Sequence, residues 1–148
     1  MTIAQMRTKN QNKKRRGVEV VELAIIMPVL LLLTFGTLEI CEGIFLRQTL
    51  ELSAHEGARV AIRRDASIED VEEAVQRHFD ARGVNFGGDI SSAVEITPDP
   101  ETAATLTPVT VRVTVDASDN LRLDLSLYRF LLGNQFEAEV IMLKEFGN

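Results

Sequence analysis

The residues whose types and spacing suggest chemistry lie where a basic segment meets an apolar one. Residues 13–16 read Lys-Lys-Arg-Arg, Gly17 follows, and Glu22 is the fifth residue after that glycine. Glycine has no side chain, so the backbone at Gly17 enters a protease cleft at low steric cost. A carboxylate inside an apolar helix is costly unless it is protonated, paired or close to the interface. The basic cluster, the glycine and the acid therefore mark this junction as the stretch where chemistry is most expected, with Glu22 as an acid that needs protonation, a partner or the interface.

This junction resembles a prepilin processing site, at which a membrane aspartyl protease cuts after the glycine and leaves the apolar helix attached. Cleavage would make Val18 the new N-terminus. Glu22 would then pair with the α-amino group of a neighbouring subunit and set the register between subunits, as buried charge pairs do elsewhere. The alternative is that Glu22 snorkels to the lipid headgroups and Gly17 is a linker residue. Glu19 is interpreted as a residue at the membrane interface that is not a second determinant of processing or assembly.

The apolar segment that must position these residues is long enough to suggest a membrane span. Residues 23–38 are 16 consecutive uncharged residues, with four successive leucines at 30–33. At about 1.5 Å per residue this core spans ~24 Å of a bilayer interior about 30 Å thick, so the flanks must contribute. We expect a transmembrane helix over 18–45. The alternatives are a buried helix of a soluble protein, which four successive leucines disfavour, and a cleaved secretory signal, which lacks a good small-x-small site.

The charge distribution orients this span. Residues 1–16 contain six basic residues and no acid, whereas residues 17–148 carry a formal charge of −12. Basic residues remain on the cytoplasmic side of a membrane. We therefore expect a basic cytoplasmic leader at 1–17 and an exported C-terminal part, in the bacterial inner membrane with a single pass.

Two sequence blocks resemble the TadE-like family, the pseudopilins or minor pilins of bacterial tight-adherence (Flp-type) pilus systems. The first block is RRGVEVVELAIIMPVLLLLTFGTLEI, which carries the family's glycine, Val-Glu, proline and leucine run. The second is RQTLELSAHEGARVA, whose Ala-x-Glu-Gly-Ala-Arg signature falls on Ala54, Glu56, Gly57, Ala58 and Arg59. Leu23 stands where an aromatic residue often follows the acid.

The resemblance implies a structural role in assembling a tight-adherence pilus, processing by the system's own prepilin peptidase, and contacts with other pilin or pseudopilin subunits and the membrane. We interpret Glu56, Gly57, Ala58 and Arg59 as a packing signature, with small residues for close approach and Arg59 paired with a nearby acid. A binding role for this signature is the alternative.

Helical spacing continues beyond the membrane segment. Leu46, Leu50, Ala54, Gly57 and Ala61 follow one helix face. Anchor and stalk are therefore predicted as one helix from about Val18 to Ile62, with the stalk at 46–65. The stripe narrows to alanine and glycine, so we expect the domain's own sheet to pack closely against it.

The remaining residues, 66–148, predict a small α+β domain. Ser67 is a helix cap, an apolar stripe runs from Ile68 to about Ala81, and Gly83 ends that helix. Strands are predicted at 93–97, 109–115 and 136–143, with a turn at 85–88 between helix and sheet. Residues 121–127 alternate like a strand, but 125–132 fit a short helix equally well. The predicted fold is α+β: a long N-terminal helix packed on a small antiparallel sheet of three or four strands with a second helix.

The sequence gives no support for an enzyme, a cofactor or a metal. It has no glycine-rich phosphate loop, no His-x-x-x-His motif and no locally supported catalytic triad. His78 is expected to be solvated, without a ligand role, and the lone Cys41 excludes an intrachain disulfide. We expect no nucleic acid and no small-molecule substrate. The alternative function is an uncleaved, signal-anchored envelope binding module of a secretion or adhesion complex.

Overall fold

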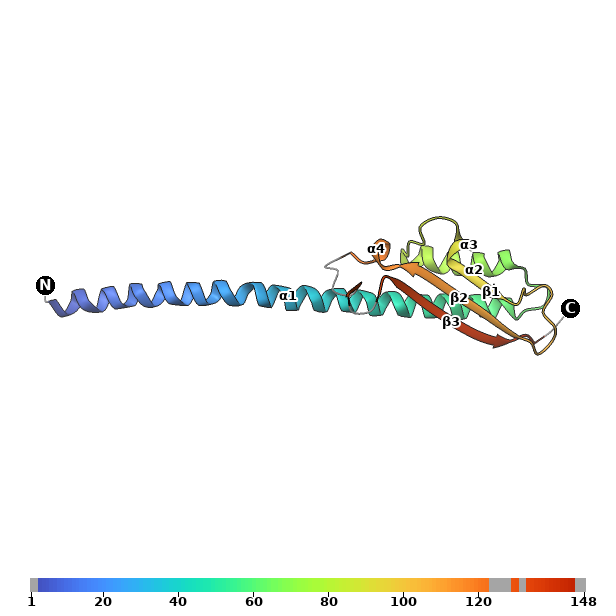
Figure 1. The fold of residues 1–148 in the computed structure, drawn as a ribbon, viewed down its shortest axis with the longest axis horizontal. Helices are drawn as coiled ribbons and strands as arrows, with labels where there is room; N and C mark the ends of the chain where they lie inside the picture. The colour runs from blue at the N-terminus through green and yellow to red at the C-terminus, as the bar shows by residue number, and fades with distance from the viewer. Residues whose placement is uncertain (1–2, 123–128, 131–132, 146–148) are drawn as a thin grey trace. The chain divides into compact units, whose positions relative to one another are not determined.

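The computed structural model describes residues 3–122, 129–130 and 133–145 (Figure 1). The chain divides into two compact units, Met1–Leu38 and Glu39–Asn148. The elements are, in chain order, α1 (Ile3–Ala61), α2 (Ile68–Arg82), α3 (Ile90–Ala93), β1 (Val94–Thr97), β2 (Pro108–Asp116), α4 (Ala117–Asn120) and β3 (Gln135–Leu143).

The predicted long helix is present, but it begins earlier than the sequence suggested. Helix α1 ends at Ala61, one residue from the expected end, whereas its first residue is Ile3 instead of Val18. The basic segment is rich in Gln, Lys, Arg and Met, all good helix formers, and a single interior glycine costs only about 1 kcal/mol relative to alanine. The expected long helix is therefore confirmed over 17–61, and the structure extends it toward the N-terminus to Ile3.

Helix α2 has the predicted bounds and both predicted ends. The Ser67 hydroxyl accepts a hydrogen bond from the Asp70 backbone N–H at 3.1 Å, and the Asp70 carboxylate accepts one from the Ser67 N–H at 3.0 Å. This capping box satisfies donors that the first helical turn leaves open, and it lowers the pKa of Asp70. Gly83 ends the helix at φ 67°, the left-handed conformation that glycine adopts without strain.

The three predicted strands form one antiparallel sheet in the order β1-β2-β3. Val111 at the centre of β2 lies opposite Ile96 on one side and Val140 on the other. The short helices α3 and α4 are additions that the sequence did not predict, because four-residue helices leave no periodic pattern. The choice between a strand over 121–127 and a helix over 125–132 falls largely on residues outside the described ones.

The domain core lies between the helices and one face of the sheet. The inward valines of β2 are all buried: Val109, Val111, Val113 and Val115. The stalk stripe of α1 meets them, since Leu50, Ala54 and Ala61 are fully buried. Helix α2 contributes Val71, Val75 and Phe79 to the same core, and Figure 1 shows it beside the stalk part of α1. The expected α+β class is confirmed, with α2 as well as the sheet packed against the stalk.

Candidate functional site

The junction residues Gly17 and Val18 lie inside α1 and are exposed. A Cβ atom built on Gly17 would meet no heavy atom within 4 Å. Nothing therefore packs against this position, and the backbone here can extend only if the helical turn around it unwinds. Glycine is the residue for which leaving the helix is cheapest, because it loses the most conformational freedom on entering one.

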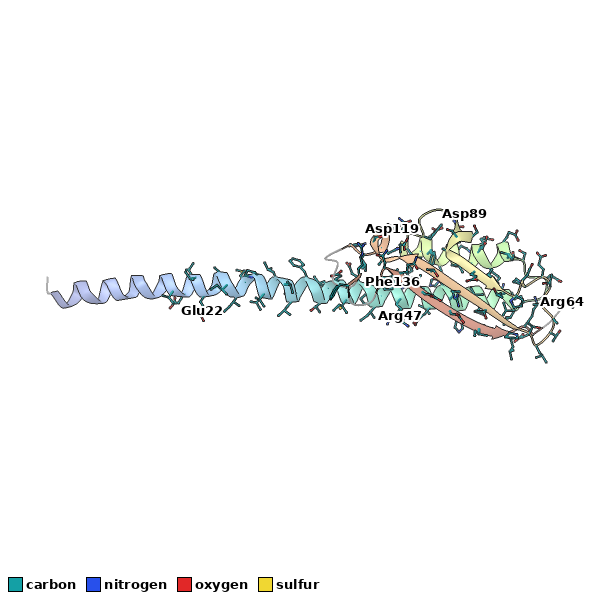
Figure 2. The ribbon with its side chains drawn as sticks, in the orientation of Figure 1. Glu22, Arg47, Arg64, Asp89, Asp119 and Phe136 are labelled. Carbon is teal, nitrogen blue, oxygen red and sulfur yellow. The ribbon has the colours of Figure 1, made fainter. Side chains whose placement is uncertain are left out.

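Glu22 follows on the same helix, five residues beyond Gly17, in a surface that is mostly apolar apart from Glu19. Its side chain is exposed and stands out from the ribbon in Figure 2. Val18 and Glu22 are separated by four residues, about one helical turn or ~6 Å along the axis, so they share a face. Their neighbours Val21, Ile25 and Ile26 are exposed apolar side chains. The structure therefore places Glu22, with Glu19 one turn before it, among apolar groups that need lipid or a partner helix.

The segment that carries this junction meets the requirements for a membrane span. Among the described residues, one helix, Gly17–Ala61, is long and apolar enough to cross a bilayer, and none of its most apolar 18-residue window is buried. A core helix of a soluble protein would bury that window. The chain therefore has one long apolar N-terminal helix consistent with a single-pass anchor.

The signature residues Glu56, Gly57, Ala58 and Arg59 divide between core and surface. Gly57 and Ala58 are buried, and a Cβ atom on Gly57 would lie 2.9 Å from the Val75 Cγ2 of α2. It would also lie 3.4 Å from side-chain atoms of Val71 and of Val111 in β2. A glycine here lets α1 approach α2 and the sheet at once. The outward pair is an ion pair, with Arg59 Nη1 3.9 Å from Glu56 Oε2, largely exposed and therefore weak.

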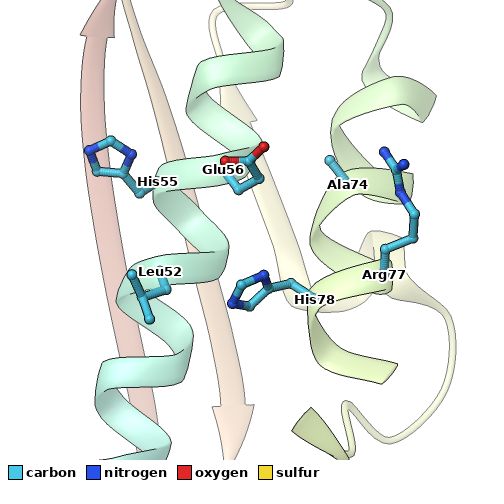
Figure 3. Close-up of a pocket in the computed structure, with 6 residues that line it drawn as sticks. All are labelled: Leu52, His55, Glu56, Ala74, Arg77 and His78. Carbon is cyan, nitrogen blue, oxygen red and sulfur yellow. The ribbon is translucent and has the colours of Figure 1, made fainter. Parts of the chain in front are cut away.

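A shallow groove of about 390 Å³ lies between α1 and α2 beside this signature (Figure 3). His78 reaches from α2 toward α1 and is half-buried, so the expectation that it is solvated is wrong. His78 follows the buried Val75 at a spacing of i+3, which places the imidazole at the border of the packed face of α2. Its Nε2 atom is buried and has no hydrogen-bond partner among the described residues.

The exposed face of the sheet carries a charge cluster that the sequence analysis missed. Arg112 of β2 lies 3.4 Å from Glu95 of β1 and, on β3, 2.9 Å from Glu137 and 2.7 Å from Glu139. The hydrogen bond with Glu139 and the charges of the other two carboxylates raise the pKa of Arg112. Glu137 and Glu139 alternate with buried residues in β3, and this alternation predicts that both side chains point outward. That they lie next to Arg112 follows only from the pairing register of the strands. The cluster joins all three strands.

None of these places has the composition of a metal centre. Within the described ranges, no group of three or more His, Cys, Asp or Glu side chains is arranged to hold a metal ion. The groove in Figure 3 combines Leu52, His55 and Glu56 with Ala74, Arg77 and His78, and His55 projects from the other side of α1. The structure thus has an exposed apolar helix that carries Glu19 and Glu22, and a small packed domain that follows it in the chain.

Comparison with known proteins agrees with this arrangement. No curated protein and no solved structure gives a significant match to the chain. One protein-family match was found, and it starts at the glycine of the junction and ends at the arginine of the packing signature. The resemblance seen in the sequence is thereby confirmed over this stretch: residues 17–59 match the TadE-like protein family.

Proposed function

We propose that this chain is a TadE-like pseudopilin or minor pilin that is processed after Gly17 by a prepilin peptidase and contributes to assembly of a tight-adherence (Flp) pilus. The observation that carries the proposal is the family match over residues 17–59, which coincides with an exposed apolar helix. A TadE-like assignment implies a role in Tad pilus assembly, and such pilins are generally structural proteins without enzymatic activity.

The proposed topology follows from the charges and the apolar segment. The basic leader at 1–17 stays in the cytoplasm, residues 18–45 cross the bacterial inner membrane, and the stalk at 46–65 carries the domain at 66–148 on the outer side. The exposed apolar side chains of α1 are stable only in contact with lipid before assembly and with neighbouring pilin helices after it. The partners are thus the membrane, the prepilin peptidase and other pilin or pseudopilin subunits.

The proposed mechanism assigns one role to each end of the junction. Cleavage between Gly17 and Val18 removes the cations that hold the leader at the cytoplasmic face and creates an α-amino group on Val18. Glu22 then provides the carboxylate that pairs with this amino group on a neighbouring subunit. Because an unpaired charge in an apolar environment is costly, only the register that pairs the two is stable.

Replacing Gly17 with leucine tests processing and function together. A branched side chain at this position obstructs entry of the backbone into a protease cleft. We expect G17L to retain residues 1–17 in mass spectrometry of isolated membranes and to fail to support pili counted by electron microscopy. The matched control is Val20→Leu, a change of similar bulk three residues away that should be processed and assemble normally.

The alternative function is an uncleaved signal-anchored envelope binding module. Under this alternative, the native chain keeps its leader and G17L functions normally. Normal pili on cells that carry G17L would therefore contradict the proposed processing and favour the binding module.

A further inference from the structure

A second groove in the domain, of about 290 Å³, lies at the end where the domain adjoins the proposed membrane span. Its lining includes Glu42 and Phe45 of α1, Arg82 at the end of α2, Asn120 at the end of α4, and Arg122. Glu42 and Phe45 are among the last residues of the proposed membrane span, which ends at residue 45. In the proposed topology, the groove therefore lies at the level of the outer lipid headgroups.

Two arginines far apart in the sequence meet at this groove. Helix α2 runs back along α1, which brings Arg82 beside Glu42 and Phe45. The Glu42 carboxylate accepts a hydrogen bond from the Arg122 backbone N–H at 3.1 Å and so ties the Arg122 segment to α1. Asn120 ties α4 to the residues after α2. Its side-chain amide donates to the Asn85 carbonyl and its oxygen accepts from the Asn85 N–H, both at 2.7 Å.

The guanidinium groups at this groove differ from most others in the domain. Arg47, Arg59, Arg77 and Arg112 each form an ion pair with a glutamate. Within the described part of the chain, the side chains of Arg82 and Arg122 form no ion pair. Both are exposed, and they share the groove with the largely exposed ring of Phe45. An arginine pair next to an apolar ring matches a phospholipid, with an anionic phosphate above an acyl chain.

We propose that Arg82 and Arg122 form a docking surface for anionic phospholipid headgroups, which holds the exported domain against the outer surface of the membrane before assembly. The inference rests on the proposed membrane topology but not on processing or on pilus formation. Charge complementarity and the position of the groove both point to the lipid. Each arginine near an anionic membrane surface favours contact about fivefold, so the pair changes the ratio of docked to undocked domain by on the order of tenfold or more.

The test uses the full chain, one copy per nanodisc, with a tryptophan reporter. The chain contains no tryptophan, so Ala81→Trp, at an exposed position next to Arg82, gives a single fluorescent signal. A spin-labelled phosphatidylcholine headgroup quenches this signal on contact. We expect stronger quenching in discs that contain phosphatidylglycerol than in discs of phosphatidylcholine alone, and a decrease with added NaCl.

The variant Arg82→Gln/Arg122→Gln should lose this difference between lipids. The matched control is Arg63→Gln/Arg64→Gln, which removes the same charge at the other end of the stalk, just after α1, where Figure 2 shows Arg64 far from Asp119 of α4. It should retain the difference. Circular dichroism verifies that both variants are folded.

Several outcomes would overturn the inference. Equal quenching in both lipids would do so, and so would unchanged quenching in the double variant. A third is that inorganic phosphate releases the domain from the lipid, seen as lost quenching, while chloride at equal ionic strength does not. That result would indicate a site for free anions. Failure of the chain to enter nanodiscs would overturn the anchor itself and the docking with it. Entry without the lipid difference would overturn the docking alone and leave the proposed function standing.

Discussion

Pili should be lost from cells in which Glu22 is replaced with alanine, while insertion and processing of the chain persist. The proposed register depends on a carboxylate that pairs with a neighbour's α-amino group in an apolar environment. Removing one partner of such a pair costs about 3–5 kcal/mol, which corresponds to a loss of roughly a hundredfold or more in the assembly equilibrium. Electron microscopy of sheared pili measures the loss, and intact mass measures whether processing still occurs.

Two further substitutions separate charge from bulk at this position. Glu22→Gln keeps the shape of the side chain but removes its charge, so it should behave like alanine. Glu19→Ala is the matched control, because Glu19 is a second exposed carboxylate of the same segment without an assigned role, and it should assemble normally. Pili of normal number on cells with E22A would show that Glu22 does not set the register.

A leucine in place of Gly57 should destabilise the domain by on the order of 3 kcal/mol. Two effects oppose each other here: removing a glycine from a helix interior gains about 1 kcal/mol, whereas overpacking a close contact typically costs 1–3 kcal/mol and more for a large side chain. The first added carbon already lies 2.9 Å from a Val75 methyl group of α2. The remaining leucine carbons would enter the space occupied by Val71 and Val111, so the cost exceeds the gain.

Thermal unfolding of the detergent-solubilised full chain, followed by circular dichroism, measures this effect. For a domain of this size, we expect Tm to fall by roughly 10 °C or more. Gln48→Leu is the control, since Gln48 is exposed on the same helix and the same side chain is introduced without a contact. An unchanged Tm in G57L would show that the close approach of α1 to α2 and β2 is not what stabilises the domain.

Much of the fold was predictable from the sequence because its signals are local. The capping residues Ser67 and Gly83 fix the ends of α2, and the alternating valines fix β2 and its inward face. The burial of the stalk stripe was also predictable, since its spacing follows a helix face. The start of α1 was not, because a basic segment of good helix formers gives no apolar pattern that would distinguish a helix from an extended leader.

The parts of the surface that depend on tertiary contacts were not predictable. His78 was expected in solvent, but whether a residue beside an apolar stripe is covered depends on how closely the next helix packs. Arg112 meets three glutamates only through strand register, and Arg82 lines the same groove as Arg122 only because α2 returns to the beginning of the stalk. The roles of Gly17 and Glu22 were proposed from their spacing and from the resemblance, and they stay predictions.

The most direct test of the account is the mass of the native chain isolated from membranes of cells that contain the peptidase. The account predicts a mature chain whose first residue is Val18, shortened by the 17 residues that precede it. A chain that still carries Met1 to Gly17 under these conditions would contradict the central claim that this protein is a processed pilin.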